Sequence, residues 1–93
     1  MNRLQLLLGK LAEECLEVAK EALKAQQFGL DSTYIGSSNE DRIRQELDDM
    51  NAIVEMLNDE FNLGYVPDAE RIFKKKIKVN KFAEYSKAEG FVS

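Results

Sequence analysis

The chain has 93 residues, of which 44% are apolar and 32% charged, a composition typical of one small soluble globular domain. The net charge of −4 disfavours a nucleic-acid partner, because binding a phosphate backbone requires a broad basic surface. The absence of histidine excludes a Ser-His-Asp or Cys-His nucleophile system and a histidine-ligated zinc site in this chain. Any chemistry must therefore use carboxylates, lysine, tyrosine or metal-bound water.

The cysteine content and the apolar runs indicate where the protein works. Cys15 is the single cysteine, so no internal disulfide can form, which fits a reducing cytoplasm. The segment Met1–Lys10 contains only a short apolar run, and we expect neither a secretory signal nor a membrane span there. No other segment is apolar for long enough, so we expect no membrane partner.

The first predicted helix runs from about Arg3 to Gln27 and ends at Phe28-Gly29. Its apolar residues follow the helical period: Leu4, Leu7, Leu8, Leu11, Cys15, Val18 and Ala22. Cys15 belongs to this stripe, and we expect it to be a core residue rather than a reactive one. A second apolar strip comprises Ala12, Leu16, Ala19 and Leu23. A lone three-helix domain would expose that strip, which favours burial in a subunit interface.

Two further helices are predicted after a polar loop from Leu30 to Ser38. Ser37 and Glu40 have the spacing of a capping box, which would open the second helix near Ser38. Its apolar stripe comprises Ile43, Leu47, Met50, Val54, Leu57 and Phe61, and it ends at 62–64. The third helix would begin at Pro67 and reach Lys87. No segment shows credible strand alternation, so the predicted fold class is all-α.

Two short pairs of acids carry the main functional signal. Glu14 and Glu17 lie three residues apart in the first helix, and Glu46 and Asp49 lie three apart in the second. Such pairs share one helix face and can supply oxygen ligands to one hard cation. Like charges at this spacing repel each other, which calls for a compensating ion. If the two helices pack antiparallel, four or five oxygens converge, and Mg²⁺ is the obvious candidate.

The third helix brings positive charge. Residues 1–66 contain 13 acidic and 6 basic residues, whereas residues 67–93 contain 4 acidic and 7 basic ones. The basic end could cover the acidic helices or contact a small polyanion held by a cation. Lys76 and Asn80 fall among apolar positions of this helix, and polar groups on an inward face need a partner. Phosphate, metal-bound carboxylates or a nucleobase edge would serve, as would the acids of the second helix.

These residues resemble the MazG-type, all-α nucleoside triphosphate pyrophosphohydrolase superfamily, which includes MazG-like proteins, a group of dUTPases and phosphoribosyl-ATP pyrophosphohydrolases. The motif of that superfamily is Glu-Glu-x-x-Glu followed by Glu-x-x-Asp. Glu13-Glu14-Cys15-Leu16-Glu17 is similar to the first half, and Glu46-Leu47-Asp48-Asp49 to the second, after 28 intervening residues. The segment 79–82 resembles a later stretch of the family that contains Asn and Lys.

The resemblance implies a four-helix core completed by oligomerisation, in homodimers or homotetramers. It also implies Mg²⁺-dependent hydrolysis of a nucleoside triphosphate to the monophosphate and pyrophosphate. The metal ligands implied are Glu14, Glu17, Glu46 and Asp49. Glu17 or Glu13 would act catalytically, as the group that accepts a proton from water or orients it. Substrate contacts would come from Lys76, Asn80 and Lys81.

Other interpretations stay open. The acids could form a solvated helix face balanced by neighbouring lysines. A phosphoribosyl-ATP pyrophosphohydrolase of histidine biosynthesis would share the acidic pattern, and a non-catalytic helical interaction module would keep only the helices. The segment 28–38 falls where the resembling family selects its base, and nothing in it identifies a particular base.

Overall fold

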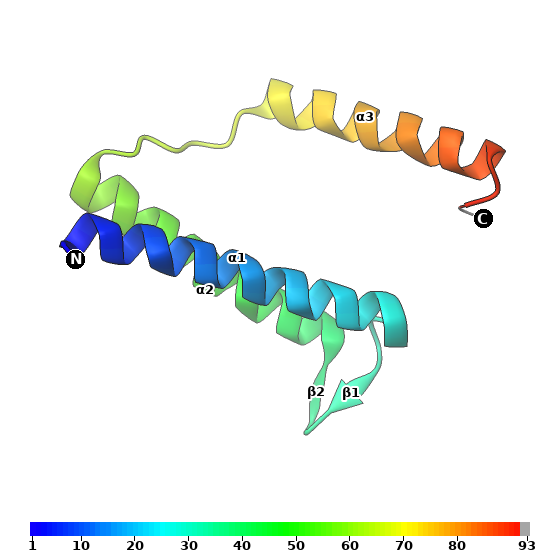
Figure 1. Cartoon of the computed structure of the whole chain (residues 1–93), viewed down its shortest axis with the longest axis horizontal. Coiled ribbons are helices and arrows are strands. Elements are labelled where there is room, and N and C mark those ends of the chain that lie inside the picture. Colours follow the sequence, from blue (N-terminus) through cyan, green and yellow to red (C-terminus); the bar gives the residue numbers. More distant parts are fainter. Residues whose placement is uncertain (92–93) are drawn as a thin grey trace.

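The computed structural model describes residues 1–91, apart from the side chain of Tyr34 (Figure 1). In chain order its elements are α1 (Arg3–Phe28), β1 (Thr33–Tyr34), β2 (Ser37–Ser38), α2 (Asn39–Phe61) and α3 (Ala69–Ala88). The predicted all-α class is therefore confirmed, with one small hairpin added. Among the described residues, no helix combines the length and the apolar character that crossing a bilayer requires.

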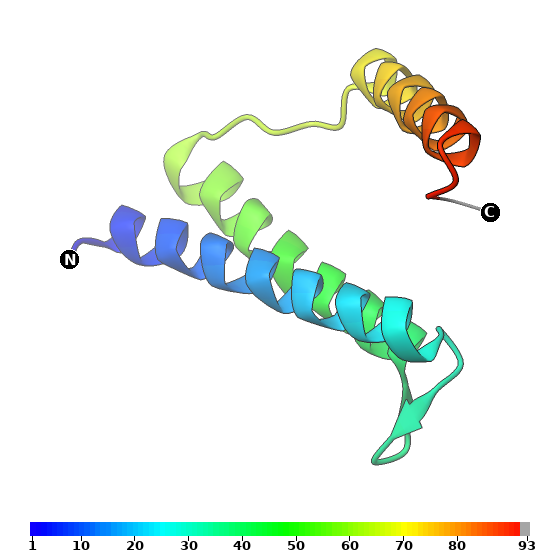
Figure 2. The same cartoon turned by 45° about the vertical axis from the view of Figure 1, so that its right-hand side comes forward.

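The first two helices form an antiparallel pair and lie side by side in both cartoon views (Figures 1 and 2). Helix α1 begins with a capping box, in which Asn2 and Gln5 each accept a hydrogen bond from the other's backbone N–H, at 2.8 and 2.9 Å. It ends at Gly29, whose φ of +93° suits glycine because a Cβ disfavours that conformation. These bounds agree with the predicted helix within one residue.

The predicted loop between the helices contains a small β-hairpin that the sequence pattern did not indicate. Thr33 pairs with Ser38 and Tyr34 with Ser37 in antiparallel register. The two connecting residues, Ile35 and Gly36, both have positive φ, at 52° and 79°, as in the tight turns typical of two-residue hairpins. Strands of two residues are too short to show an alternating pattern, which explains why the sequence did not indicate them.

Helix α2 begins one residue later than the predicted capping box implied. Ser38, rather than Ser37, caps it by accepting a hydrogen bond from the Asp41 backbone N–H at 3.1 Å. The helix ends at Asn62, which adopts the left-handed conformation, as asparagine readily does at this position. The predicted end at 62–64 is therefore confirmed.

Helix α3 stands apart from the α1–α2 pair, and the extensive helix packing within residues 1–91 is between α1 and α2 (Figures 1 and 2). Asp68 caps α3 through the Arg71 backbone N–H at 3.0 Å, so the helix begins two residues after the predicted Pro67. The segment before it runs in an extended path. Asn58 holds that path, because its side chain exchanges two hydrogen bonds with the Tyr65 backbone, at 2.9 and 3.0 Å.

The core of the single chain is small. Among the described residues, the buried apolar side chains are Leu7 at 2% exposure and Leu57 at 1%. The chain exposes 7574 Å², whereas a compact monomer of this size exposes about 5,500 Å². Its Cα radius of gyration of 16.7 Å likewise exceeds the value of about 12 Å expected for 93 residues.

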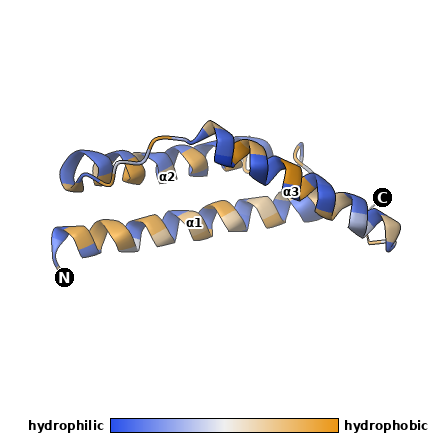
Figure 3. Cartoon of the chain, turned by 90° about the horizontal axis from the view of Figure 1, so that it is seen from above, coloured by the Kyte–Doolittle hydropathy of each residue, from blue (hydrophilic) through white to orange (hydrophobic). Residues whose placement is uncertain are grey.

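Large apolar side chains remain exposed on the helices, and apolar residues recur along α1 and α3 in the hydropathy view (Figure 3). Leu16 and Leu23, from the predicted second strip, are 70% and 63% exposed, as expected for a lone chain. Cys15 is exposed too, so the prediction of a core cysteine was wrong. It lies at the rim of the α1–α2 interface, with its Sγ 3.8 Å from the Met50 Sδ.

Candidate metal centre

Three carboxylates converge between α1 and α2. Glu14 comes from α1, Glu46 and Asp49 come from α2, and one oxygen of each lies within 4.8 Å of the others. The arrangement follows from the sequence, because Glu46 and Asp49 share a helix face and the antiparallel packing turns that face toward α1. The predicted convergence of acids from two helices is thus present for these three residues, hereafter the acidic cluster.

Glu17 lies beside the acidic cluster without belonging to the closest trio. It is half-buried, and its charge acts on Glu46. Burial is the largest cause that raises the pKa of Glu46 above its ordinary value, and neighbouring charges raise it further: Asp49, Glu17, Glu14 and Glu21. Repulsion among these carboxylates disfavours the charged form of Glu46, and a bound cation would reverse that effect.

Glu21 adds a second feature that would suit a cation. Its side chain is buried, and its Oε2 has no hydrogen-bond partner, whereas its Oε1 lies 3.6 Å from the Lys24 Nζ. A buried carboxylate oxygen without a partner is unfavourable. Glu21 lies four residues after Glu17 on the same side of α1, but its burial depends on how the helices pack. Glu21 therefore belongs with the candidate site residues.

Glu13 lies outside this group. Its carboxylate is exposed and pairs with Lys10 on the same helix, with an Nζ–Oε2 distance of 3.1 Å. The backbone geometry explains the difference, because residues adjacent in a helix point about 100° apart. A direct role for Glu13 at the acidic cluster remains a prediction from the resemblance, and this chain's geometry favours Glu17 over it.

The predicted substrate contacts lie on a different part of the molecule. Lys76, Asn80 and Lys81 are on α3, all are exposed, and α3 stands apart from the acidic cluster (Figures 1 and 2). The expectation that Lys76 and Asn80 face inward was wrong for the single chain, because within residues 1–91 no other helix packs extensively against α3. Their role now depends on whether another subunit brings α3 to the acids.

The donor set indicates which kind of ion fits. Carboxylate oxygens are preferred by hard cations such as Mg²⁺, Mn²⁺ or Ca²⁺, whereas zinc and copper sites in proteins usually contain nitrogen or sulfur. Glu14, Glu46 and Asp49 could supply direct ligands, and the unpartnered oxygen of Glu21 could bind the ion or one of its waters. The residues present therefore fit a hard divalent cation.

Comparison with known proteins adds no identification: no family matches the chain, and neither a curated protein nor a solved structure is similar to it.

Proposed function

We propose that this chain is a Mg²⁺-dependent nucleoside triphosphate pyrophosphohydrolase of the MazG type. The observation that carries the proposal is the convergence of Glu14, Glu46 and Asp49 from two helices, beside the buried, unpartnered oxygen of Glu21. Such a cluster is costly without a cation, and a hard cation between carboxylates is typical of phosphate chemistry. Glu14, Glu46 and Asp49 also belong to the acidic motifs that resemble that superfamily.

The proposed reaction is hydrolysis at the α-phosphorus. The oxygen of water forms a new bond to that phosphorus, the bond to the bridging oxygen breaks, and pyrophosphate leaves. When bound, Mg²⁺ would neutralise phosphate charge and lower the pKa of water. Glu17 would accept the proton that water loses, and its position beside the acidic cluster, outside the three closest members, supports this role.

We further propose that the working protein is a homodimer or homotetramer. The chain exposes about 2,000 Å² more than a compact monomer would, which is the size of a substantial protein–protein interface. A second copy could bring its basic α3 against the acidic α1–α2 pair. That arrangement would give Lys76, Asn80 and Lys81 access to the phosphates, consistent with a cytoplasmic enzyme of nucleotide-pool housekeeping.

The test measures pyrophosphate release from natural and damaged nucleotides and from phosphoribosyl-ATP, with and without Mg²⁺. Glu17→Gln and Asp49→Asn should each lower kcat/KM by about 100-fold or more while the helices stay folded. Asp48→Asn is the matched control, because Asp48 is exposed, adjacent in sequence and outside the acidic cluster. It should retain activity within about twofold.

Other outcomes separate the remaining functions. Activity confined to phosphoribosyl-ATP would identify the enzyme of histidine biosynthesis. Silence of the wild-type chain across the whole panel would contradict the enzymatic proposal and favour a helical interaction module.

A further inference from the structure

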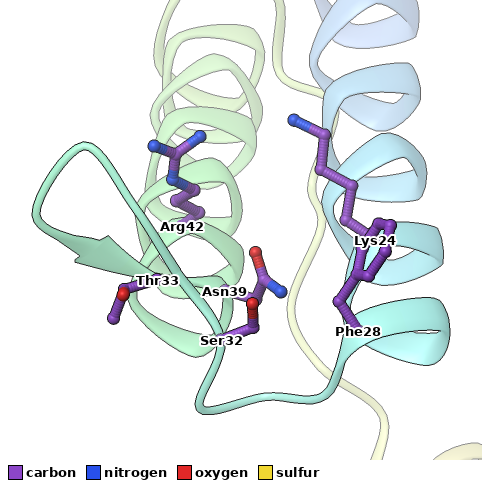
Figure 4. A pocket seen from close by; sticks show the side chains of 6 residues that line it. All are labelled: Lys24, Phe28, Ser32, Thr33, Asn39 and Arg42. Carbon is purple, nitrogen blue, oxygen red and sulfur yellow. The ribbon is translucent and has the colours of Figure 1, made fainter.

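A pocket of about 410 Å³ opens at the end of the α1–α2 pair, next to the β-hairpin (Figure 4). It lies between the last turns of α1, the segment 32–33 and the first turn of α2. Its lining residues are Lys24, Phe28, Ser32, Thr33, Asn39 and Arg42. Two of these six side chains are cationic and none is acidic, so the lining of the pocket is electropositive, although α2 is acidic and Glu21 lies beside Lys24.

Along the two helices, the two cations of the pocket lie close to the acids of the candidate metal centre. Lys24 lies three residues after Glu21 in α1, and Arg42 lies four residues before Glu46 in α2. Because the helices are antiparallel, the two cations lie about one turn beyond Glu21 and Glu46, toward the same end of the pair. The 3.6 Å pair between Glu21 Oε1 and Lys24 Nζ connects the pocket to Glu21, whose charge acts on Glu46 of the acidic cluster. A chain of phosphates could therefore extend from the acidic cluster into the pocket.

The polar floor of the pocket is held in place. Asn39 is 6% exposed, its Nδ2 donates to the Gly29 carbonyl at 2.9 Å, and its backbone N–H donates to the Ser32 carbonyl at 2.9 Å. In the close view, the Asn39 Oδ1 and the end of the Lys24 side chain both extend into the space between the helices (Figure 4). A fixed floor of this kind favours binding, because little order is gained or lost when a ligand enters.

We propose that this pocket binds the terminal phosphates of the substrate and then the leaving pyrophosphate, while the α-phosphate lies at the acidic cluster. The inference rests on the proposed function and assigns Lys24 and Arg42 to the leaving group. Lysine and arginine form strong charge-assisted hydrogen bonds to phosphate oxygens. The resemblance suggests base selection near this segment, but two cationic side chains in the lining suit an oxyanion better than a neutral base.

The cation and the anion would bind cooperatively. Lys24 lies close to Glu21, which competes with any anion for the positive charge of Lys24. A divalent ion at the acidic cluster offers Glu21 a different partner and leaves Lys24 available. Mg²⁺ should therefore strengthen pyrophosphate binding beyond the effect of direct coordination, and that extra effect should depend on Lys24.

Calorimetric titration of the full chain with inorganic pyrophosphate, with and without Mg²⁺, tests this assignment. Lys24→Gln and Arg42→Gln should each weaken binding in Mg²⁺ by at least about tenfold. The matched controls are Lys20→Gln, an exposed lysine one turn earlier on α1, and Arg44→Gln, whose guanidinium pairs with Asp41 outside the pocket. Both controls should bind within about twofold of wild type. Circular dichroism establishes that each variant keeps its helices, and two independent variants guard against misfolding of one.

Either of two results would overturn the assignment while leaving the proposed function intact. In the first, both pocket variants keep the wild-type affinity for pyrophosphate in Mg²⁺. In the second, a phosphate-free nucleoside binds without displacing pyrophosphate and its affinity falls in the pocket variants, so that the nucleoside rather than pyrophosphate occupies the pocket. A wild-type chain that binds no divalent ion would instead contradict the proposed function itself, and with it this inference. Pyrophosphate should also inhibit turnover of the wild type more strongly than turnover of Lys24→Gln.

Discussion

Glu21 and Lys24 join the acidic cluster to the electropositive pocket, because Oε1 of Glu21 lies 3.6 Å from Nζ of Lys24 while Oε2 of the same carboxylate has no hydrogen-bond partner. The Glu21 carboxylate, between the acidic cluster and the cationic pocket, thus has a partner for only one of its two oxygens. A lysine contact through one oxygen leaves the other buried oxygen uncompensated. This relationship makes Glu21 the most direct probe of whether a cation belongs in the cluster.

Glu21→Gln should weaken divalent-ion affinity by about tenfold, as loss of an outer partner of a metal site typically does. At an ion concentration 100 times the wild-type Kd, the ion stabilises wild type by about 2.7 kcal/mol and the variant by about 1.4 kcal/mol. Thermal melts with and without Mg²⁺ measure this difference. Glu55→Gln, an exposed acid on α2 outside the cluster, should behave as wild type. If Mg²⁺ stabilises Glu21→Gln as much as it stabilises wild type, Glu21 does not belong to the cation site.

Glu46→Gln should stabilise the metal-free chain. Burial and four neighbouring carboxylates raise the pKa of Glu46, so its charge is unfavourable in the folded state at neutral pH. Removing like-charge repulsion on helices contributes about 0.2–0.5 kcal/mol per pair. Urea unfolding in the presence of a chelator should therefore show a small gain, and added Mg²⁺ should stabilise this variant less than wild type. If Glu46→Gln is less stable than wild type in the presence of the chelator, repulsion between Glu46 and its neighbouring carboxylates does not limit stability.

The parts of the structure that were predictable from the sequence depend on local signals. The bounds of α1 and α2 follow from caps such as Gly29 and Asn62, and the pairing of Glu46 with Asp49 follows from helical spacing alone. The burial of Glu21, the position of α3 and the pocket at Asn39 depend on how segments distant in sequence pack. Helical periodicity carries no information about such packing, so it predicts an inward face for Lys76 and Asn80 that the single chain does not provide.

The pairing of Arg3 with Glu60 predicts a pH dependence of stability. Arg3 binds both carboxylate oxygens, at 2.9 and 3.1 Å, and joins the start of α1 to the end of α2. The hydrogen bond from Arg3 lowers the pKa of Glu60 below its ordinary value of 4.5. The folded state therefore binds its proton less readily than the unfolded state, and the pair stabilises the fold above about pH 4.5 and progressively less as pH falls through the lowered pKa.

Glu60→Gln tests this dependence. The variant should be less stable than wild type at pH 7, and the difference should shrink as pH falls below 4.5, when wild type also loses the charge. Because both side chains are exposed, added salt should reduce the difference at pH 7 as well. Urea unfolding across this pH range measures the difference in free energy of unfolding between wild type and Glu60→Gln. If that difference does not change with pH, the ion pair is not its cause.

Ile35→Asn should stabilise the β-hairpin. Ile35 has a φ of 52° and is 82% exposed, so the isoleucine adopts an unfavourable left-handed conformation without gaining burial. That conformation disfavours β-branched residues, whereas Asn followed by Gly is the preferred pair for such a turn. The substitution should raise the free energy of unfolding by about 1 kcal/mol. Ile35→Val keeps the branched Cβ and should give no gain, so equal effects of the two would exclude backbone strain.

The exposed apolar side of α3 predicts self-association through that helix. Phe73 and Ile77 lie four residues apart on that side and are 63% and 40% exposed, more than large apolar side chains prefer. Phe73→Ser and Ile77→Ser should each shift the chain toward monomer in sedimentation velocity at tens of micromolar, because each removes apolar area from the proposed interface. Val66→Ser, in the extended segment before α3 and 77% exposed, is the control and should associate as wild type. A wild-type chain that sediments as a monomer would contradict the association, and with it the proposed access of Lys76 to the acidic cluster of another subunit.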